Sequence, residues 1–378
     1  MKIVIAPDSF KGTLTAAAAA AAIAAGLKSE VDGLDVVLMP LSDGGEGLTE
    51  ILTTARGGHY REIQVCGPHS QRIVAKYGLI DGGATAVLEA AQACGLTLVG
   101  ATARDPWRAT SFGFGEMIVD AIEQGAKALI LGVGGTASMD GGLGVLQALG
   151  ARVTDEAGRA AFVPANASIL RGAPVINIGT LTQVTSNIDV TIASDVENPL
   201  IGALGAARIF GPQKGADSET IRLIDSGLSR LYGDLERRTR RRFRHRRGFG
   251  AGGGIAAGLA SLLPHVRLVR GVDLVLDQIG FSAAIKGADW VVTGEGRIDA
   301  QSFRGKVLSG VCRALEGTEI RVAAIGGTID DQYVNDKRFA AMESCLDVAG
   351  DLDDFEMRAE EKLRSAARRL AHRIRIFP

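Results

Sequence analysis

The sequence predicts an α/β protein in which both chain ends build one parallel-sheet domain and a second α/β domain is inserted between them. Short β-branched strands alternate with helical segments at the start of the chain and again near its end. The middle of the chain has a different pattern of elements, with paired strands around a glycine turn. Polar, glycine-rich clusters follow strands in both parts. We place the first domain at residues 1–66 plus 286–378 and the inserted domain at 67–285.

The first domain opens with a β-α-β unit. Residues 2–6 are a short apolar strand, and a second strand is expected at 36–39. Between them, Thr13 or Thr15 can cap a helix whose body holds seven consecutive alanines, at 16–22. A crossover of this kind implies parallel strands.

The same order returns near the end of the chain. A strand at 288–292 is expected to end at the polar segment that follows, and a helix at 306–316 leads to a strand at 321–325. A last strand is expected at 342–348, and residues 354–374 read as a charged amphipathic helix.

The inserted domain contains two paired strands, at 72–80 and 85–88, around Asp-Gly-Gly. Buried strands are expected at 127–131 and 190–193. One face of a helix is marked by Ile221, Ile224, Leu228, Leu231 and Leu235.

Composition excludes several classes of protein. Of 378 residues, 46% are hydrophobic and the net charge is −1, so no global field selects nucleic acid or an anionic membrane. The four cysteines are scattered and the five histidines show no ligand spacing, which argues against a disulfide scaffold, a zinc site or a histidine-based triad. No apolar run is long enough to span a membrane, and Asp8 and Lys11 interrupt the start of the chain, so we expect no signal peptide and a cytoplasmic protein.

Polar clusters follow the first two strands, where open α/β sheets bind ligands. The first strand leads to Ser9 and Lys11, and the second leads to the segment LSDGGEG, in which Asp43 and Glu46 stand among glycines. Glycine lets backbone approach a ligand closely, and a plain turn is the alternative. Two carboxylates beside an anionic ligand would repel it. We therefore expect at least one to be paired with a cation, and Lys11 is the expected partner.

The densest glycine loop spans residues 132–144. Successive N–H groups of such a loop can bind phosphate, with Thr136 and Ser138 as hydroxyl donors. A tight strand–helix turn that needs glycine for packing is the alternative. The loop is neither a Walker A motif nor a clean G-x-G-x-x-G fingerprint.

Three further clusters offer charged groups. After the strand at 190–193, Asp195 could bind Mg²⁺ or take a proton, and Asn198 could order the turn or the metal shell. A simple Asp/Asn-Pro turn is the alternative. Lys214 lies in a constrained glycine-proline turn. Near the end of the chain two acids and two bases fall within twelve residues: Glu295, Arg297, Asp299 and Lys306.

Residues 237–247 hold eight arginines. They could bind nucleic acid, but no aromatic platform accompanies them, so a solvated helix end and loop is the favoured interpretation.

The segments APDSFKG, LSDGGEG, ASDVENPL with FGPQKGA, and TGEGRID-x-QS-x-x-GK, in this order, resemble the bacterial type-1 glycerate kinase family over residues 1 to about 350. The resemblance implies ATP-dependent, Mg²⁺-assisted phosphorylation of D-glycerate to 2-phosphoglycerate. It also implies a Rossmann- or flavodoxin-like domain with a second α/β domain inserted, and a site in the cleft between them. The chain departs from the family pattern at Met139, where asparagine is usual, and at Leu48, where threonine is usual.

Roles are then expected as follows. Phosphoryl transfer needs positioning and charge neutralisation. Mg²⁺ would be held by Asp195 and Glu295, with Asp43 as a further candidate. The catalytic residues are expected to be Asp195, Lys11, Asp43 and Lys214. Substrate is expected to contact Ser9, Gly44, Gly45, Glu46, Arg297 and Lys306. Nucleotide is expected to contact Gly134, Gly135, Thr136, Ser138, Asp140 and Asn198.

Alternatives remain open at this stage. The product could be 3-phosphoglycerate, or the substrate a related small hydroxy acid. A nucleotide- or RNA-binding regulator using residues 237–247 is a reading from another class. A dinucleotide-dependent oxidoreductase is a third interpretation, but this chain lacks the G-x-G-x-x-G turn that such an enzyme carries after its first strand. The partners expected are D-glycerate and ATP, with no membrane and no nucleic acid, and homo-oligomerisation is left open.

Overall fold

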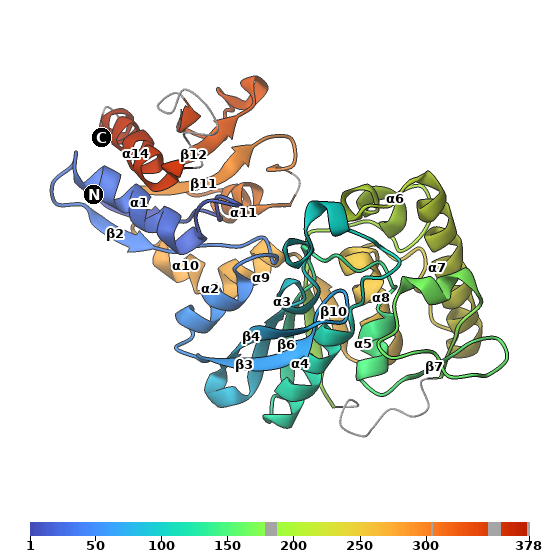
Figure 1. Cartoon of the computed structure of the whole chain (residues 1–378). Helices are drawn as coiled ribbons and strands as arrows, with labels where there is room; N and C mark the ends of the chain where they lie inside the picture. Colours follow the sequence, from blue (N-terminus) through green and yellow to red (C-terminus); the bar gives the residue numbers. More distant parts are fainter. Residues whose placement is uncertain (178–186, 304, 347–356, 376–378) are drawn as a thin grey trace. The chain divides into compact units, whose positions relative to one another are not determined.

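A computed structural model describes residues 1–177, 187–303, 305–346 and 357–375 (Figure 1). The chain divides into two compact units. Unit 1 comprises residues 1–51 and 270–378, and unit 2 comprises residues 52–269. The boundaries expected from the sequence, after residues 66 and 285, lie later in the chain. The strand just before residue 66 pairs inside the sheet of unit 2, and the helices just before residue 285 belong to unit 1.

Unit 1 is built on a five-stranded, fully parallel sheet in the order β13-β12-β11-β1-β2. Its strands are β1 (Lys2–Ile5), β2 (Asp35–Leu38), β11 (Trp290–Ile298), β12 (Arg321–Ile329) and β13 (Ala341–Ser344). Its helices are α1 (Ala16–Lys28), α9 (Gly271–Gln278), α10 (Phe281–Ala284), α11 (Val307–Ala314) and α14 (Ala359–Arg375). The sheet confirms the predicted α/β class and joins both chain ends, since β1 lies between β2, its neighbour in sequence, and β11 from the C-terminal part of the chain.

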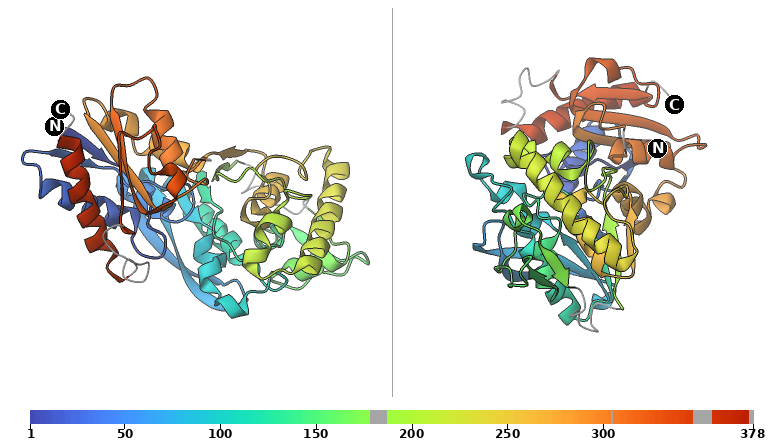
Figure 2. Two further views of the ribbon diagram at one scale, coloured as in Figure 1. Left: turned by 90° about the horizontal axis from the view of Figure 1, so that it is seen from above. Right: turned by 90° about the vertical axis from the view of Figure 1, so that its right-hand side faces the viewer.

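The helix α1 begins where the sequence predicts. Thr15 is its N-cap, and the Thr15 hydroxyl accepts a hydrogen bond from the Ala18 N–H at 3.2 Å. Small residues let α14 approach closely: a Cβ on Gly26 would lie 2.4 Å from the Arg364 carbonyl oxygen. The two helices therefore lie side by side, as Figures 1 and 2 show. Residues 347–348 and 354–356 of the predicted last strand and tail helix lie outside the described residues.

Unit 2 has a six-stranded sheet in the order β10-β9-β6-β5-β4-β3. Its first four members are parallel, and β3 and β4 are antiparallel additions. The strands are β3 (His59–Cys66), β4 (Arg72–Ile80), β5 (Thr85–Glu89), β6 (Ala128–Gly132), β9 (Asp189–Ala193) and β10 (Val266–Val269), with a small hairpin of β7 (Arg152–Thr154) and β8 (Val175–Asn177). The predicted pairing of β4 with β5 around Asp-Gly-Gly is confirmed.

Helices of unit 2 cover a large hydrophobic core, and Val99, Ala109 and Ala137 form a small separate cluster. They are α3 (Ala91–Cys94), α4 (Phe112–Glu123), α5 (Leu143–Ala148), α6 (Ala206–Phe210), α7 (Ser218–Thr239) and α8 (Ile255–Leu262). The helix α2 (Leu48–Ala55) spans the division between the units. On α7 the predicted apolar face is confirmed, because Ile224, Leu228, Leu231 and Leu235 are buried. Among the described helices, none is both long and apolar enough to cross a membrane.

Candidate active site

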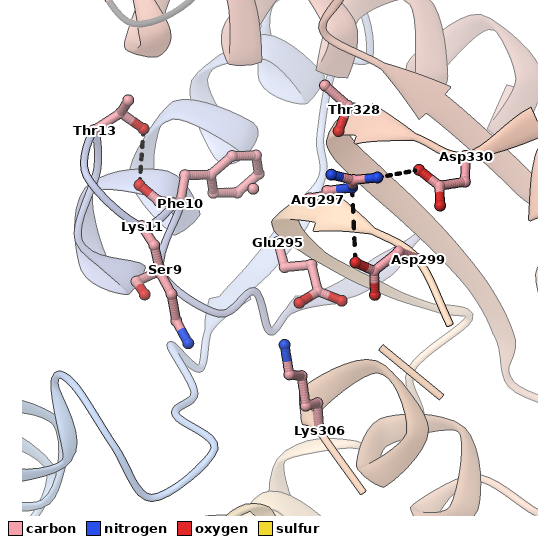
Figure 3. Close-up of a pocket in the computed structure, with 11 residues that line it drawn as sticks. Ser9, Phe10, Lys11, Thr13, Glu295, Arg297, Asp299, Lys306, Thr328 and Asp330 are labelled. Atoms are coloured by element: carbon pink, nitrogen blue, oxygen red, sulfur yellow. Dashed lines mark hydrogen bonds and ion pairs between the residues drawn. The ribbon is translucent and has the colours of Figure 1, made fainter. Parts of the chain in front are cut away.

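Unit 1 contains a pocket of about 500 Å³ at the carboxyl ends of its central strands (Figure 3). Open parallel sheets bind ligands at this edge. The lining includes charged and hydroxyl groups from the segment after β1, from β11 and β12 and the residues just after them, and from the N-cap of α11: Ser9, Lys11, Thr13, Glu295, Arg297, Asp299, Lys306, Thr328 and Asp330. The structure therefore brings four of the predicted residues, Ser9, Lys11, Arg297 and Lys306, and the predicted metal ligand Glu295, into one pocket.

Strand β11 is longer than expected and includes two of these residues, Glu295 and Arg297. The prediction that this strand spans residues 288–292 is wrong at its end, since β11 continues to Ile298 and pairs with β12 along its length. Glycine in the segment TGEGRI lowers its strand propensity, and only the partner strand stabilises the extended form. In this extension Glu295 and Arg297 lie two residues apart, so they share one side of the strand.

Two carboxyl groups at this edge are buried. Asp8 is 3% exposed, and its N–H donates to the Gly294 carbonyl oxygen at 2.8 Å, which fixes it against β11. Burial, together with the charge of Asp43, raises the pKa of Asp8 to about 8. Burial also raises the pKa of Glu295. A hydrogen bond from Ser302 and the charges of Lys306 and Lys11 oppose this increase in pKa. In Figure 3 the amine of Lys306 points towards the Glu295 carboxylate.

Lys11 forms the ion pair expected of it. Its Nζ lies 3.5 Å from Oδ2 of Asp43, which confirms the predicted pairing, and Asp43 is the first cause of the raised pKa of Lys11. The glycines beside Asp43 also shape the turn: the Gly45 N–H donates to Asp43 Oδ1 at 3.0 Å. At Gly44 the φ of 88° is one that favours glycine. Glu46 is exposed.

Arg297 is held in place by two acids. Its guanidinium lies 3.1 Å from Oδ1 of Asp330 and 3.7 Å from Oδ2 of Asp299, and both pairs are drawn in Figure 3. This neutralises much of the Arg297 charge. Lys306 is the N-cap residue of α11, where the helix dipole adds positive potential. Of these two predicted substrate cations, Lys306 therefore has more charge left to meet an anion.

Unit 2 gathers its polar groups at the corresponding edge of its own sheet. The last residues of β5, β6 and β9 are neighbours in register, with Glu89 opposite Gly132 and Gly132 opposite Ala193. The loops that follow β6 and β9 therefore leave the sheet next to each other. The first of these is the glycine-rich loop, and the second carries Asp195, which is half-buried.

Lys214 reaches into the glycine-rich loop. Its Nζ donates to the Ser138 carbonyl oxygen at 2.8 Å and to the Thr136 hydroxyl at 3.2 Å. The residue is 4% exposed, and burial lowers the pKa of its amine to about 8, against the opposing charge of Asp140. The structure thus places the predicted lysine and two predicted hydroxyl residues together.

Asp140 lies inside unit 2 rather than on its surface. It is fully buried, and its carboxylate accepts hydrogen bonds from four donors: the Ser111 N–H and hydroxyl and the N–H groups of Gly142 and Gly144, at 2.8 to 3.2 Å. Burial raises its pKa, which these hydrogen bonds oppose. The geometry makes Asp140 a group that holds the loop in shape.

Much of the glycine content of this loop serves packing. A second glycine turn, at residues 250–254, lies against it: a Cβ on Gly253 would be 2.2 Å from the Ser138 carbonyl oxygen. The Gly141 N–H donates to the Gly253 carbonyl oxygen at 3.0 Å. By contrast, Gly134 and Gly135 are exposed at the tip of the loop. The tip is therefore the part that can meet a phosphate.

The loop after β9 is ordered partly by Asn198. The Asn198 side-chain amide donates to the Leu204 carbonyl oxygen at 2.9 Å, so this residue supports the turn. Five of the eight arginines in residues 237–247 bind carboxylates or backbone carbonyls: Arg237, Arg238, Arg241, Arg244 and Arg247.

Sequence reasoning did not single out Asp8 or Glu89 as site residues. Both are buried acids at the carboxyl end of a strand, 3% and 5% exposed. The available signal was position, since Glu89 ends an apolar strand and Asp8 lies three residues after one.

The donor set of the structure bears on Mg²⁺. Within the described residues no group of three acidic, histidine or cysteine side chains is arranged to hold a metal. Mg²⁺ bound through one or two carboxylates plus substrate phosphates needs no such group. The two predicted ligands, Asp195 in unit 2 and Glu295 in unit 1, are oxygen donors of the kind that Mg²⁺ prefers.

Comparisons with known proteins match the family that the sequence motifs resemble. The profile of the glycerate kinase family matches residues 3–375. A glycerate kinase of Haemophilus influenzae is 40% identical over 373 residues, with 98% of each chain covered. A glycerate 2-kinase of Escherichia coli is 38% identical, covering 98% of this chain and 97% of that one. A crystal structure described as glycerate kinase 2 of Salmonella typhimurium matches with a TM-score of 0.84 at 37% identity, covering 100% of this chain and 98% of that one.

Proposed function

Because this chain belongs to the glycerate kinase family, we propose that it transfers a phosphoryl group from ATP to the 2-hydroxyl of D-glycerate. The single observation that carries the proposal is the polar pocket of unit 1, together with the family. The pocket offers lysines, a buried carboxylate and hydroxyl groups at the carboxyl edge of a parallel sheet. Such a set suits a small hydroxy acid, which needs cations for its carboxylate and hydrogen-bond partners for its hydroxyls.

Within this proposal, unit 1 binds glycerate. Lys306, at the start of α11, and Lys11 supply positive charge for the substrate carboxylate. Arg297, which is neutralised by Asp299 and Asp330, shapes the wall of the pocket. Phosphoryl transfer depends mainly on positioning and charge neutralisation, so a rigid pocket of this kind suits the reaction.

Unit 2 contributes the groups proposed for the nucleotide. The exposed tip of the glycine-rich loop, at Gly134 and Gly135, offers backbone to the phosphates. Lys214 supports that loop from inside and adds positive charge next to Thr136. Mg²⁺, entering with the ATP phosphates, would offset their negative charge when bound. Asp195 is the preferred protein ligand, because the charges of Lys306 and Lys11 already act on the Glu295 carboxylate.

The central test is Asp195→Asn. If Asp195 orients the hydroxyl or holds the metal, kcat for ATP-dependent phosphorylation of D-glycerate should fall by about 100-fold or more. The matched control is Asp189→Asn, which changes an exposed aspartate at the start of β9, the strand that precedes Asp195, and should leave kcat unchanged. Near wild-type turnover by a folded Asp195→Asn enzyme would remove Asp195 from the proposed machinery.

The phosphorylated position needs its own measurement. Incubation with ATP, Mg²⁺ and D-glycerate, followed by phosphorus NMR of the product, separates 2-phosphoglycerate from 3-phosphoglycerate. We expect the 2-isomer. Detection of the 3-isomer alone would keep the kinase and change its regiochemistry, and turnover only with another hydroxy acid would change the substrate.

A further inference from the structure

A second charged pocket lies in unit 2, at the C-terminal end of α7. Its volume is about 290 Å³. Five arginines and one carboxylate, Glu236, contribute to its lining. The arginines are Arg237, Arg240, Arg241, Arg242 and Arg244. Neither the family nor the proposed reaction assigns this pocket a role.

The frame of the pocket is fixed by hydrogen bonds. One oxygen of Glu236 accepts from the N–H groups of Phe243 and Arg244, at 2.7 and 2.9 Å, and the other accepts from Arg244 Nε at 2.8 Å. The guanidinium of Arg241 donates to the Ala260 carbonyl oxygen at 2.6 Å. The turn that follows α7 is therefore tied to the helix, and the arginines project from a preorganised support.

The positive charge of the pocket exceeds the negative charge available to it. Glu236 is already paired with Arg244. Arg237 lies 3.4 Å from Asp234, which Arg238 holds more closely at 2.7 Å. In the described parts of the chain, no carboxylate forms an ion pair with Arg240, Arg241 or Arg242. Unpaired like charges held together repel one another, and an anion removes that cost.

The fold alone does not account for this arrangement. A helix C-terminus attracts cations, but the effect is confined to the last turn, and Arg241 and Arg242 lie beyond it. Arg240 occupies the left-handed position that ends α7, with φ 56°, where glycine is the usual residue. An arginine at this strained position adds a guanidinium to the pocket lining.

We propose that this pocket binds a small, multiply charged anion that carries phosphate. Guanidinium groups pair with phosphate oxygens through two parallel hydrogen bonds, which makes arginine the suited residue for such ligands. The volume fits a small molecule. Single-stranded nucleic acid is disfavoured, because it needs exposed aromatic rings for base stacking and Phe243 and Phe249 are each only 1% exposed.

Inorganic pyrophosphate is the probe of choice, measured by calorimetry on the full-length protein. The test variant is the double substitution Arg240→Gln/Arg242→Gln. The matched control is Arg208→Gln/Arg222→Gln, which removes two positive charges from exposed positions on α6 and α7 outside the pocket. We expect wild type and control to bind pyrophosphate alike and the test variant to bind it at least tenfold more weakly. Equal affinity in all three proteins would overturn the proposal.

Further measurements distinguish the possible causes of weaker pyrophosphate binding. Inorganic phosphate should bind more weakly than pyrophosphate and show the same dependence on Arg240 and Arg242, since it carries fewer charges. Kinase turnover at saturating substrates should be equal in all three proteins, which separates this pocket from the catalytic groups. If a single-stranded RNA oligomer loses affinity in the test variant while pyrophosphate does not, the pocket is a nucleic-acid contact and the proposal fails.

Discussion

Asp8 and Lys214 show how burial sets the charge of single residues in this protein. Burial raises the pKa of Asp8 to about 8 and lowers that of Lys214 to about 8. In both cases desolvation favours the neutral form. Asp8 therefore retains a proton through much of the physiological range and can act as a hydrogen-bond donor beside the unit 1 pocket.

The Asp8 carboxyl predicts a specific pH dependence of stability. Its folded-state pKa lies above the unfolded value of 3.8, so its contribution is complete below pH 4 and is lost as pH rises through about 8. Asp8→Asn removes this titration. We expect the free energy of unfolding of the variant, relative to wild type, to increase by more than about 1.4 kcal/mol between pH 5 and pH 8, the equivalent of one pKa unit.

Urea unfolding at the two pH values measures this difference. Asp35→Asn, which changes an exposed aspartate on β2, is the control and should track wild type at both. Parallel stability curves for wild type and Asp8→Asn would show that the Asp8 carboxyl is ionised in the folded protein at pH 5.

At the scale of elements, the glycine-rich loop and the turn at 250–254 act as one packed unit. Backbone of the two segments is close enough that a side chain would not fit between them, and Asp140 fixes the loop from within. The loop conformation therefore depends on a segment more than a hundred residues away in sequence. A methyl group introduced between the two segments should therefore lower the free energy of unfolding.

Gly253→Ala should be strongly destabilising. A Cβ there would lie 2.2 Å from the Ser138 carbonyl oxygen, and φ is 66°. The left-handed backbone costs about 1–2 kcal/mol for alanine, and overpacking adds about 1–3 kcal/mol. Gly57→Ala is the matched control, with φ 60° and nothing within 4 Å of its Cβ, so it carries the first cost alone. Equal losses in thermal or urea unfolding would mean that the loop and turn yield without cost.

The elements also show what could be predicted from sequence. Strands β1, β6 and β9 were predictable because they are short, mostly buried runs rich in aliphatic residues. The strand β3 was not, because it is mostly polar and partly exposed, and only pairing with β4 makes it a strand. The extension of β11 was missed for a related reason. Its glycines predict a turn from the sequence alone, and it is the pairing with β12 that keeps the segment extended.

The site was predictable to the same degree. Lys11 and Asp43 could be paired because they follow neighbouring parallel strands. The buried position of Asp140 could not be foreseen, since it depends on long-range packing of Ser111 and the 250–254 turn. Burial of Asp8 is likewise a property of the assembled sheet edge, which periodicity along the chain does not show.

At the scale of the whole molecule, the two units differ in how the chain forms them. Unit 1 needs both chain ends, because β1 lies between β2 and β11 in its sheet. Unit 2 is one continuous segment with its own sheet and hydrophobic core. A continuous segment that buries its own core can fold without the rest of the chain.

We therefore predict that a fragment of residues 47–269, which keeps α2 intact, folds on its own. Circular dichroism should show helix and strand, and urea unfolding should be cooperative. A fragment of residues 1–51 is the contrasting case. It lacks β11, β12 and α14, so β1 loses one neighbour and α1 loses the helix packed against Gly26, and we expect it to remain unfolded. A 47–269 fragment with native-like helix content but no cooperative transition would show that the core of unit 2 requires unit 1.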